Sequence, residues 1–153
     1  MSDVRLRMEG MVFALRAGVV CVREDRVLVI SGDWFDFRYL PGGAVAVGED
    51  TAECAAREFE EETGVKAEPL RLLCVMENHF ELNGEKWHEV GFYYHMAAPS
   101  DLPSGPFQQR DDARVVMNWV PIQDMNQLRV MPPGLQDALL SPNRGVKHVV
   151  QRQ

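Results

Sequence analysis

Residues 43–65 read GAVAVGEDTAECAAREFEEETGV, and the second half of this segment predicts a single helix. Asp50 is suited to cap that helix, and Glu53, three residues later, completes a capping box. Gly64 is suited to end the helix in a left-handed conformation. We therefore predict a helix over residues 51–63.

Three glutamates of this helix, Glu58, Glu61 and Glu62, stand at positions i, i+3 and i+4. That spacing gathers them on one arc, with side-chain bases roughly 5–6 Å apart. Like charges so placed destabilise a helix by about 0.2–0.5 kcal/mol per pair, so a sequence serving stability alone would place Lys or Arg among them. We interpret the arc as oxygen ligands for a hard divalent cation such as Mg²⁺ or Mn²⁺, and a solvated glutamate-rich surface is the alternative.

The neighbouring positions support the same interpretation. Arg57 lies on the flank of the arc, where its guanidinium can hold one of the glutamates by a two-pronged hydrogen bond. The apolar side of the helix, formed by Ala52, Ala55, Ala56 and Phe59, is expected to pack on a sheet. We expect the carboxylates to lie off that packing face.

The segment as a whole resembles a known sequence signature. Gly43, five residues, Glu49, seven residues and then Arg57–Val65 resemble the complete signature box of the Nudix hydrolases. The resemblance implies an α/β fold, the Nudix α/β/α sandwich around a mixed β-sheet. It also implies Mg²⁺- or Mn²⁺-dependent hydrolysis of a nucleoside diphosphate linked to another moiety. Ala46 and Phe59 depart from the commonest family pattern, but neither departure removes a metal ligand.

The same resemblance assigns roles residue by residue. Glu58 and Glu62 correspond to the principal metal ligands, and Glu61 to a further ligand or the general base. The carbonyl of Gly43 is a further implied ligand, and Glu49 supports the loop or ligates through water. The implied catalytic residues, with the orienting arginine first, are Arg57, Glu58 and Glu61.

Outside this segment the sequence predicts strands and loops. Hairpins are expected from residues 11–22 with 27–30 and from 70–80 with 86–96, the latter around Asn83-Gly84, and a last strand from 115–120. Irregular loops are expected over 31–43 and 98–113, and short helices between 122 and 139. Residues 1–10 and 141–153 are expected to be loosely held ends of one domain that covers residues 1–153.

Aromatic residues crowd the loop before the predicted helix, with Phe35 and Phe37 among them. In that loop Trp34 or Tyr39 could stack on a nucleobase, and Arg38 could contact phosphate. The alternative for these rings is that they cover the sheet.

The second predicted hairpin carries two adjacent polar residues, His88 and Glu89. If they face the predicted helix of residues 51–63, Glu89 is an additional metal ligand or base and His88 contacts substrate. The alternative is a role at a strand edge or on the surface. Asp111 and Asp112, in the long loop, are a second candidate source of a distant carboxylate.

Composition narrows the possible partners. The 153 residues include 16 Lys+Arg and 23 Asp+Glu, a net charge of −7, and residues 49–62 alone hold seven acids and one arginine. Because no basic stripe is present, we expect no nucleic-acid polymer as partner. No apolar run approaches the roughly 20 residues that cross a bilayer, so we expect no membrane partner. The first residues, MSDVRLRMEG, also lack a hydrophobic stretch of the secretory kind, so we expect a cytoplasmic protein. The three cysteines are odd in number and widely spaced, which predicts three separately buried thiols. A homodimer is a further expected possibility.

The expected partner is a small-molecule nucleotide, either a nucleoside triphosphate or a nucleotide-sugar-like diphosphate. The alternative is a catalytically inactive nucleotide-binding or regulatory module with the same fold. The intact Glu58, Glu61 and Glu62 argue against that alternative, because losing these charges would relieve repulsion. Removal of RNA caps is disfavoured by the lack of a basic surface and of a second domain.

Overall fold

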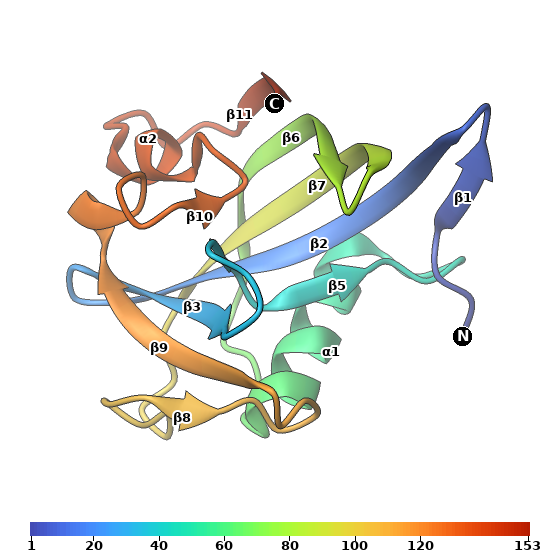
Figure 1. Ribbon diagram of the computed structural model, residues 1–153. Helices are drawn as coiled ribbons and strands as arrows, with labels where there is room; N and C mark the ends of the chain where they lie inside the picture. The colour runs from blue at the N-terminus through green and yellow to red at the C-terminus, as the bar shows by residue number, and fades with distance from the viewer.

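Three long strands form the centre of the computed structural model, which describes residues 1–153 (Figure 1). β2 (Met11–Arg23) pairs in parallel with β7 (Glu85–Ala97), and β7 pairs antiparallel with β6 (Arg71–Leu82). The turn between β6 and β7 is Asn83-Gly84, and both of its residues have positive φ. The predicted second hairpin is therefore confirmed.

A second group of strands continues the sheet on the other side of β2. It contains β3 (Arg26–Gly32), β4 (Arg38–Tyr39), β8 (Phe107–Gln108), β9 (Val115–Pro121) and β10 (Val130–Met131). β2 and β3 form the predicted hairpin only next to its turn, with Val22 opposite Val27, after which β3 pairs antiparallel with β9. Because β10 pairs in parallel with β4, the sheet is mixed in this part as well.

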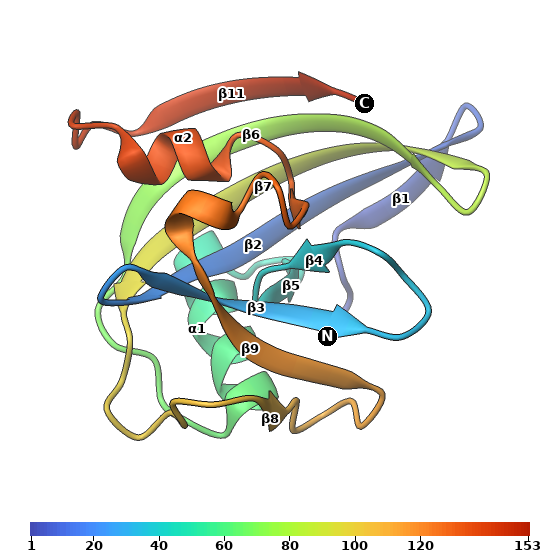
Figure 2. The same ribbon diagram turned by 60° about the vertical axis from the view of Figure 1, so that its left-hand side comes forward.

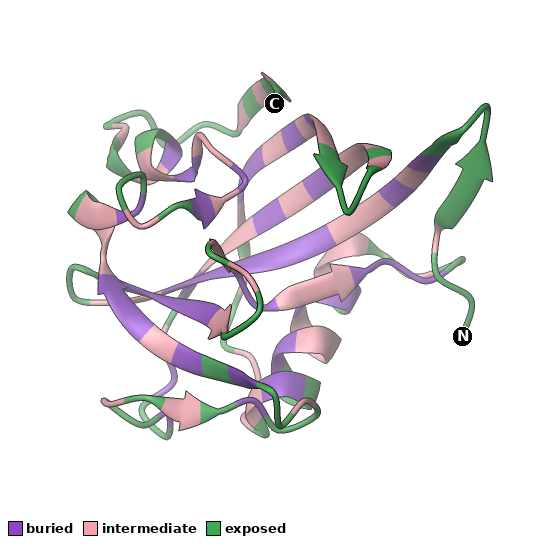
Figure 3. Ribbon diagram, in the orientation of Figure 1, coloured by how far each residue is buried: buried purple, intermediate pink, exposed green.

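Helices cover both faces of this sheet, as Figure 2 shows. α1 (Thr51–Thr63) packs on one face, where Ala55 and Phe59 are fully buried in a core with β2, β3 and β9 residues. α2 (Leu135–Leu140) and the 3-10 turn η1 (Ile122–Asp124) lie over the other face, around a second core. Figure 3 shows the resulting alternation of buried and partly exposed residues along the long strands. The predicted helix–sheet–helix layering is confirmed.

The predicted limits of α1 are confirmed in detail. The backbone N–H of Asp50 donates to the Glu53 carboxylate at 3.1 Å, one half of the expected capping box. Gly64 adopts φ 74°, and its N–H donates to the Glu60 carbonyl at 2.8 Å. Both signals act within a few residues, so tertiary structure is not needed to produce them.

Both segments expected to be irregular loops contain short strands: β4 and β5 (Gly42–Ala44) lie within or next to residues 31–43, and β8 lies within 98–113. Of these, β5 pairs with β2. The prediction was wrong because glycine permits this pairing as well as irregular structure. Gly42 has φ 151°, and a side-chain carbon there would lie 2.3 Å from the Ala17 carbonyl oxygen. Only glycine can therefore approach β2 so closely.

Both chain ends were wrongly expected to be loosely held. β1 (Arg5–Met8) pairs antiparallel with β2, and β11 (Lys147–Arg152) pairs in parallel with β6. β6 would otherwise be an open sheet edge, so β11 satisfies its backbone groups, and Val149 packs against the second core. The partner that orders this segment lies some seventy residues away, and no local pattern reports it.

Two further expectations concern the cysteines and membranes. Cys21, Cys54 and Cys74 are all buried and free, as predicted. A search of the helices finds none of the length and apolar character needed to cross a bilayer.

Candidate functional site

Glu62 is the most buried of the three helix carboxylates, with 4 % of its surface exposed. Its Oε1 accepts a hydrogen bond from the Gly42 N–H at 2.8 Å, so α1 and β5 are joined through this side chain. Burial raises the pKa of Glu62 to about 8, although the Gly42 N–H and the Arg16 charge act in the opposite direction. The expectation that all three carboxylates avoid the packing face was therefore wrong for Glu62.

Glu58 lies against the next glycine of the same strand. A side-chain carbon on Gly43 would be 2.5 Å from the carboxyl carbon of Glu58, so the absence of a side chain makes room for this carboxylate. Burial raises the pKa of Glu58, and the nearby Arg57 acts against that effect. Two carboxylates of one helix thus meet two consecutive glycines.

Arg57 connects the helix with the loop before it. Its guanidinium donates two hydrogen bonds to the Glu49 carboxylate, from Nε to Oε2 at 2.7 Å and from Nη2 to Oε1 at 3.0 Å. The third nitrogen, Nη1, donates to Glu58 at 3.1 Å and to Glu61 at 3.2 Å. The predicted two-pronged contact exists, but its partner is Glu49 and not one of the arc glutamates.

Glu49 is held as an anion by these contacts. The hydrogen bonds from Arg57 lower the pKa of Glu49 to about 2, and the Ala46 N–H, which donates to it at 3.1 Å, acts in the same direction. Glu49 therefore fixes the loop between β5 and α1 and keeps Arg57 next to the other carboxylates.

Glu61 is exposed and turned toward Arg57, so the structure does not bring the three arc glutamates together around one point. No three His, Cys, Asp or Glu side chains enclose a common metal position. The donors present still fit a hard cation, because Glu58, Glu62 and the neighbouring Gly43 carbonyl offer oxygen alone. A cation there would also offset the burial of the two carboxylates.

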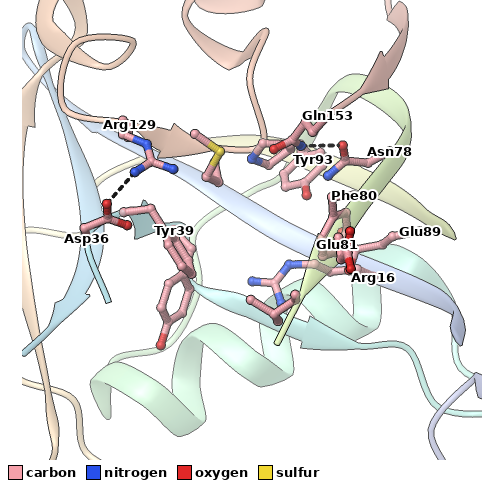
Figure 4. Close-up of a pocket in the computed structure, with 14 residues that line it drawn as sticks. Arg16, Asp36, Tyr39, Asn78, Phe80, Glu81, Glu89, Tyr93, Arg129 and Gln153 are labelled. Atoms are coloured by element: carbon pink, nitrogen blue, oxygen red, sulfur yellow. Dashed lines mark hydrogen bonds and ion pairs between the residues drawn. The ribbon is translucent and has the colours of Figure 1, made fainter. Parts of the chain in front are cut away.

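A cavity of about 390 Å³ opens beside this carboxylate group (Figure 4). Its walls combine rings, charges and amides. They include Arg16, Asp36, Phe37, Tyr39, Asn78, Phe80, Glu81, Glu89, Tyr93, Arg129 and Gln153.

Arg16 lies between the cavity and the acidic helix. It comes from the middle of β2, donates to the Leu40 carbonyl at 3.1 Å, and its charge acts on the pKa of both Glu62 and Glu89. Arg16 thus links the charges of the cavity with those of the acidic helix, although no residue of α1 itself lines the cavity. An arginine within an otherwise apolar strand was a usable signal that the sequence reasoning missed.

Three other cavity residues were also missed. The Gln153 amide donates to the Asn78 side-chain oxygen at 2.9 Å, which joins β6 to the end of β11 (Figure 4). The hydroxyl of Tyr93 is buried and has no hydrogen-bond partner. No sequence signal identifies these three residues, because strand pairing alone places them together.

Only one of the three predicted substrate-contact residues of the aromatic loop lines the cavity. Tyr39 lines the cavity, next to Phe37. Trp34 is 58 % exposed outside the cavity, with the Arg114 guanidinium 5.0 Å from its ring centre. Arg38 donates to the Leu128 carbonyl at 3.0 Å and does not line the cavity either.

The two hairpin residues lie on opposite faces of β7, as strand alternation requires. Glu89 lines the cavity, and burial raises its pKa while the Arg16 charge lowers it. His88 instead stacks on His79, with ring centres 4.5 Å apart, and does not line the cavity. Glu89 is therefore the member of this pair that can serve the site.

The other candidate carboxylates, in the long loop, are engaged locally. Asp111 accepts a hydrogen bond from the Gln109 amide at 2.7 Å, and Asp112 pairs with Arg114 at 3.0 Å. Neither lines the cavity beside α1.

Comparisons with known proteins agree on one family. Residues 12–139 match the model of the NUDIX domain. Diphosphoinositol polyphosphate phosphohydrolase 2 of Rattus norvegicus is 41 % identical over 70 residues, which cover 43 % of this chain and 39 % of that protein. Diphosphoinositol polyphosphate phosphohydrolase 3-beta of Homo sapiens is 38 % identical over 85 residues, covering 53 % and 49 % respectively. The chain thus spans less than half the length of these curated relatives.

Solved structures give the same result. A MutT NUDIX hydrolase from Burkholderia pseudomallei superposes with a TM-score of 0.66 at 28 % identity, covering 84 % of this chain and 98 % of that one. A MutT protein from Bacillus halodurans has a TM-score of 0.67 at 16 % identity, covering 91 % and 90 %, and supports the fold alone.

Proposed function

From the membership of this chain in the Nudix family, which the comparisons establish, we propose that it is a hydrolase of pyrophosphate linkages in small nucleotides. The observation that carries this proposal is the placement of Glu58 and Glu62 against Gly43 and Gly42, next to the cavity that Arg16 lines. A merely solvated surface would not bury Glu62 and partly bury Glu58 against two glycines.

The proposed catalytic group includes Mg²⁺ or Mn²⁺ held by Glu58, Glu62 and the Gly43 carbonyl, with Glu61 and Glu89 as further candidates. When bound, such a cation neutralises phosphoryl charge and lowers the pKa of an attacking water. The protein fixes the geometry: the Gly42 N–H holds Glu62, and Arg57 holds Glu58 and Glu61 in one orientation. Glu61 or Glu58 accepts the proton of the attacking water.

The charges of the cavity favour a nucleotide as substrate. Arg129 is already paired with Asp36 at 2.7 Å, and the Arg16 charge acts on Glu89. Glu81 lies opposite Lys86 in the pairing of β6 with β7, so the cavity has no surplus of cations. The aromatic walls suit a base, and the Asn78–Gln153 amides offer both donors and acceptors to its edge. We propose a nucleoside triphosphate or a nucleotide-sugar-like diphosphate, whose base occupies the cavity while its phosphates approach α1.

A second candidate comes from the named relatives, which are phosphohydrolases of diphosphoinositol polyphosphates. Such a substrate carries phosphate groups around its whole ring and needs several unpaired cations. Because Arg16 and Arg129 each have an acidic neighbour, this cavity does not provide them. The inactive nucleotide-binding module remains the competing alternative from a different class.

One experiment separates these possibilities. The protein is incubated with Mg²⁺ or Mn²⁺ and a panel of nucleoside triphosphates, nucleotide sugars and a diphosphoinositol polyphosphate, and released phosphate or nucleotide is measured. We expect hydrolysis of nucleotides alone, loss of activity in Glu58→Gln and Glu62→Gln, and normal activity in the exposed matched control Glu60→Gln. Hydrolysis of only the inositol compound would overturn the substrate assignment, and a silent panel would favour the inactive module.

Two wider proposals follow from the packing. Because β1 and β11 both join the central sheet, we propose that residues 1–153 form one domain. The three free, buried cysteines fit a reducing compartment, and we propose the cytoplasm.

A further inference from the structure

A second cavity, of about 380 Å³, lies over the end of β6 and β7 that is far from their connecting turn. In Figure 2 the connection from α2 to β11 is at the far left, whereas the β6–β7 turn is at the right. The cavity is open to solvent and is bordered by this connection, by α2 and by the first residues of β6. It shares no lining residue with the cavity beside α1.

The walls of this second cavity carry positive charge alone. Arg71, Arg144 and Lys147 line it, and no carboxylate does. None of the three forms an ion pair, although the chain has a net charge of −7 and makes ion pairs with Arg7, Arg57, Arg114 and Arg129. Cations gathered without counter-charges repel one another, so the folded protein is poised to gain energy from an anion there.

A histidine of the wall is affected by the same unbalanced charge. His95, on β7, lines this cavity opposite Arg71 of β6, and the charges of Arg71 and Arg144 both act on it. Burial lowers the pKa of His95, and the charges of the two arginines lower it further. At neutral pH His95 is therefore an uncharged hydrogen-bonding group beside fixed cations.

The floor is apolar and the rim is fixed in shape. Hydrophobic residues from four elements form the floor, namely Val22, Leu73, Ile122, Ala138 and Leu139. In the rim, the Asn143 side chain accepts a hydrogen bond from the Gly145 N–H at 2.8 Å, and the Lys147 ammonium donates to the Asn143 carbonyl. These two hydrogen bonds hold together the turn that carries Arg144 and leads into Lys147 at the start of β11.

We propose that this second cavity binds a phosphorylated small molecule, with its phosphate on Arg71, Arg144 and Lys147 and its ring on the apolar floor. Arginine side chains bind phosphate oxygens in a two-pronged manner, and lysine adds a point charge. The volume is in the range of cavities that hold small ligands, roughly 300–1,000 Å³. This site is separate from α1 and does not depend on the proposed hydrolase activity.

The test is a ¹H–¹⁵N NMR titration of the full chain with AMP and with inorganic phosphate, in EDTA so that no cation contributes. We expect the amides of residues 143–147 and the His95 ring signal to shift, and AMP to bind more tightly than phosphate because of the floor. Arg71→Gln/Arg144→Gln should weaken AMP binding at this site about tenfold or more. Lys147→Gln is a second, milder variant in case the double variant fails to fold.

Arg152→Gln is the matched control, because Arg152 is an exposed cation of the same strand as Lys147 and does not line the cavity. Its affinity should equal that of the wild type. Shifts confined to Tyr39, Tyr93 and their neighbours, or equal weakening by Arg152→Gln, would overturn the proposed site. Equal affinity for AMP and phosphate would overturn the role of the floor.

Discussion

The substitution Glu62→Gln should stabilise the metal-free protein while abolishing its activity. The amide retains an oxygen that can accept the Gly42 N–H, so the shape of the site is preserved. Burial raises the pKa of Glu62 to about 8 from 4.5, and each unit corresponds to about 1.36 kcal/mol. At pH 7 this carboxyl is ionised in the unfolded protein but mostly protonated in the folded one, so folding must take up a proton at a cost of about 3 kcal/mol, which the amide removes.

The pH dependence has a definite sign. Because the pKa of Glu62 is higher in the folded than in the unfolded protein, the folded state binds more protons between pH 4.5 and about 8. The stability of the wild type in EDTA should fall as pH rises through that interval, and Glu62→Gln should lack this part of the slope. Urea unfolding at several pH values measures both quantities.

The control is Glu60→Gln, an exposed position of the same helix, which should change stability by less than about 0.5 kcal/mol. Saturating Mg²⁺ should stabilise the wild type and leave Glu62→Gln nearly unchanged. If Glu62→Gln is no more stable than the wild type in EDTA at pH 7, the burial of the Glu62 carboxyl does not carry the cost we infer.

Three other substitutions follow from the same site. Gly43→Ala would place a methyl group on the Glu58 carboxyl, so we expect at least about tenfold lower kcat/KM with a nearly unchanged Tm. Arg57→Lys loses the two-pronged contact, so the pKa of Glu49 should rise from about 2 toward its ordinary value in a ¹³C NMR titration, with a stability loss of about 2 kcal/mol at pH 7. Tyr93→Phe removes a buried, unpartnered hydroxyl, so the free protein should gain about 1 kcal/mol while KM for nucleotide rises.

For each of these three predictions, one result would contradict the reasoning. Full activity of Gly43→Ala would mean that Glu58 has room to move without consequence. An unchanged Glu49 titration in Arg57→Lys would show that Ala46 alone holds the anion. Lower stability of Tyr93→Phe would indicate a partner for the hydroxyl in solution, and Tyr94→Phe serves as its comparison because the Tyr94 hydroxyl bonds Thr51 at 2.7 Å.

Local signals predicted the limits of α1 well. The capping residues Asp50 and Glu53 and the terminating Gly64 act within one turn of helix, so the helix limits could be read without its surroundings. The turn Asn83-Gly84 defined the long hairpin in the same way. The carboxylate spacing placed Glu58 and Glu62 on neighbouring turns facing β5, but it did not predict that Glu61 turns away toward Arg57.

Features that depend on distant pairing could not be predicted. The burial of Glu62 requires Gly42 to lie on β2, and the sequence shows only a glycine pair that suits a loop equally well. The cavity residues Asn78 and Gln153 meet because β11 pairs with β6 in parallel. Periodicity reports which residues of a strand face the same way, but not which strand lies beside it.

The position of β11 has a consequence for how the protein is made. A chain emerging from the ribosome can form the acidic helix and the β6–β7 hairpin early, because those parts are close in sequence. The cavity beside them lacks a wall until Gln153 has been synthesised and has paired with Asn78. Nascent chains would therefore carry the carboxylates before they possess the complete cavity, which closes only once β11 has paired with β6.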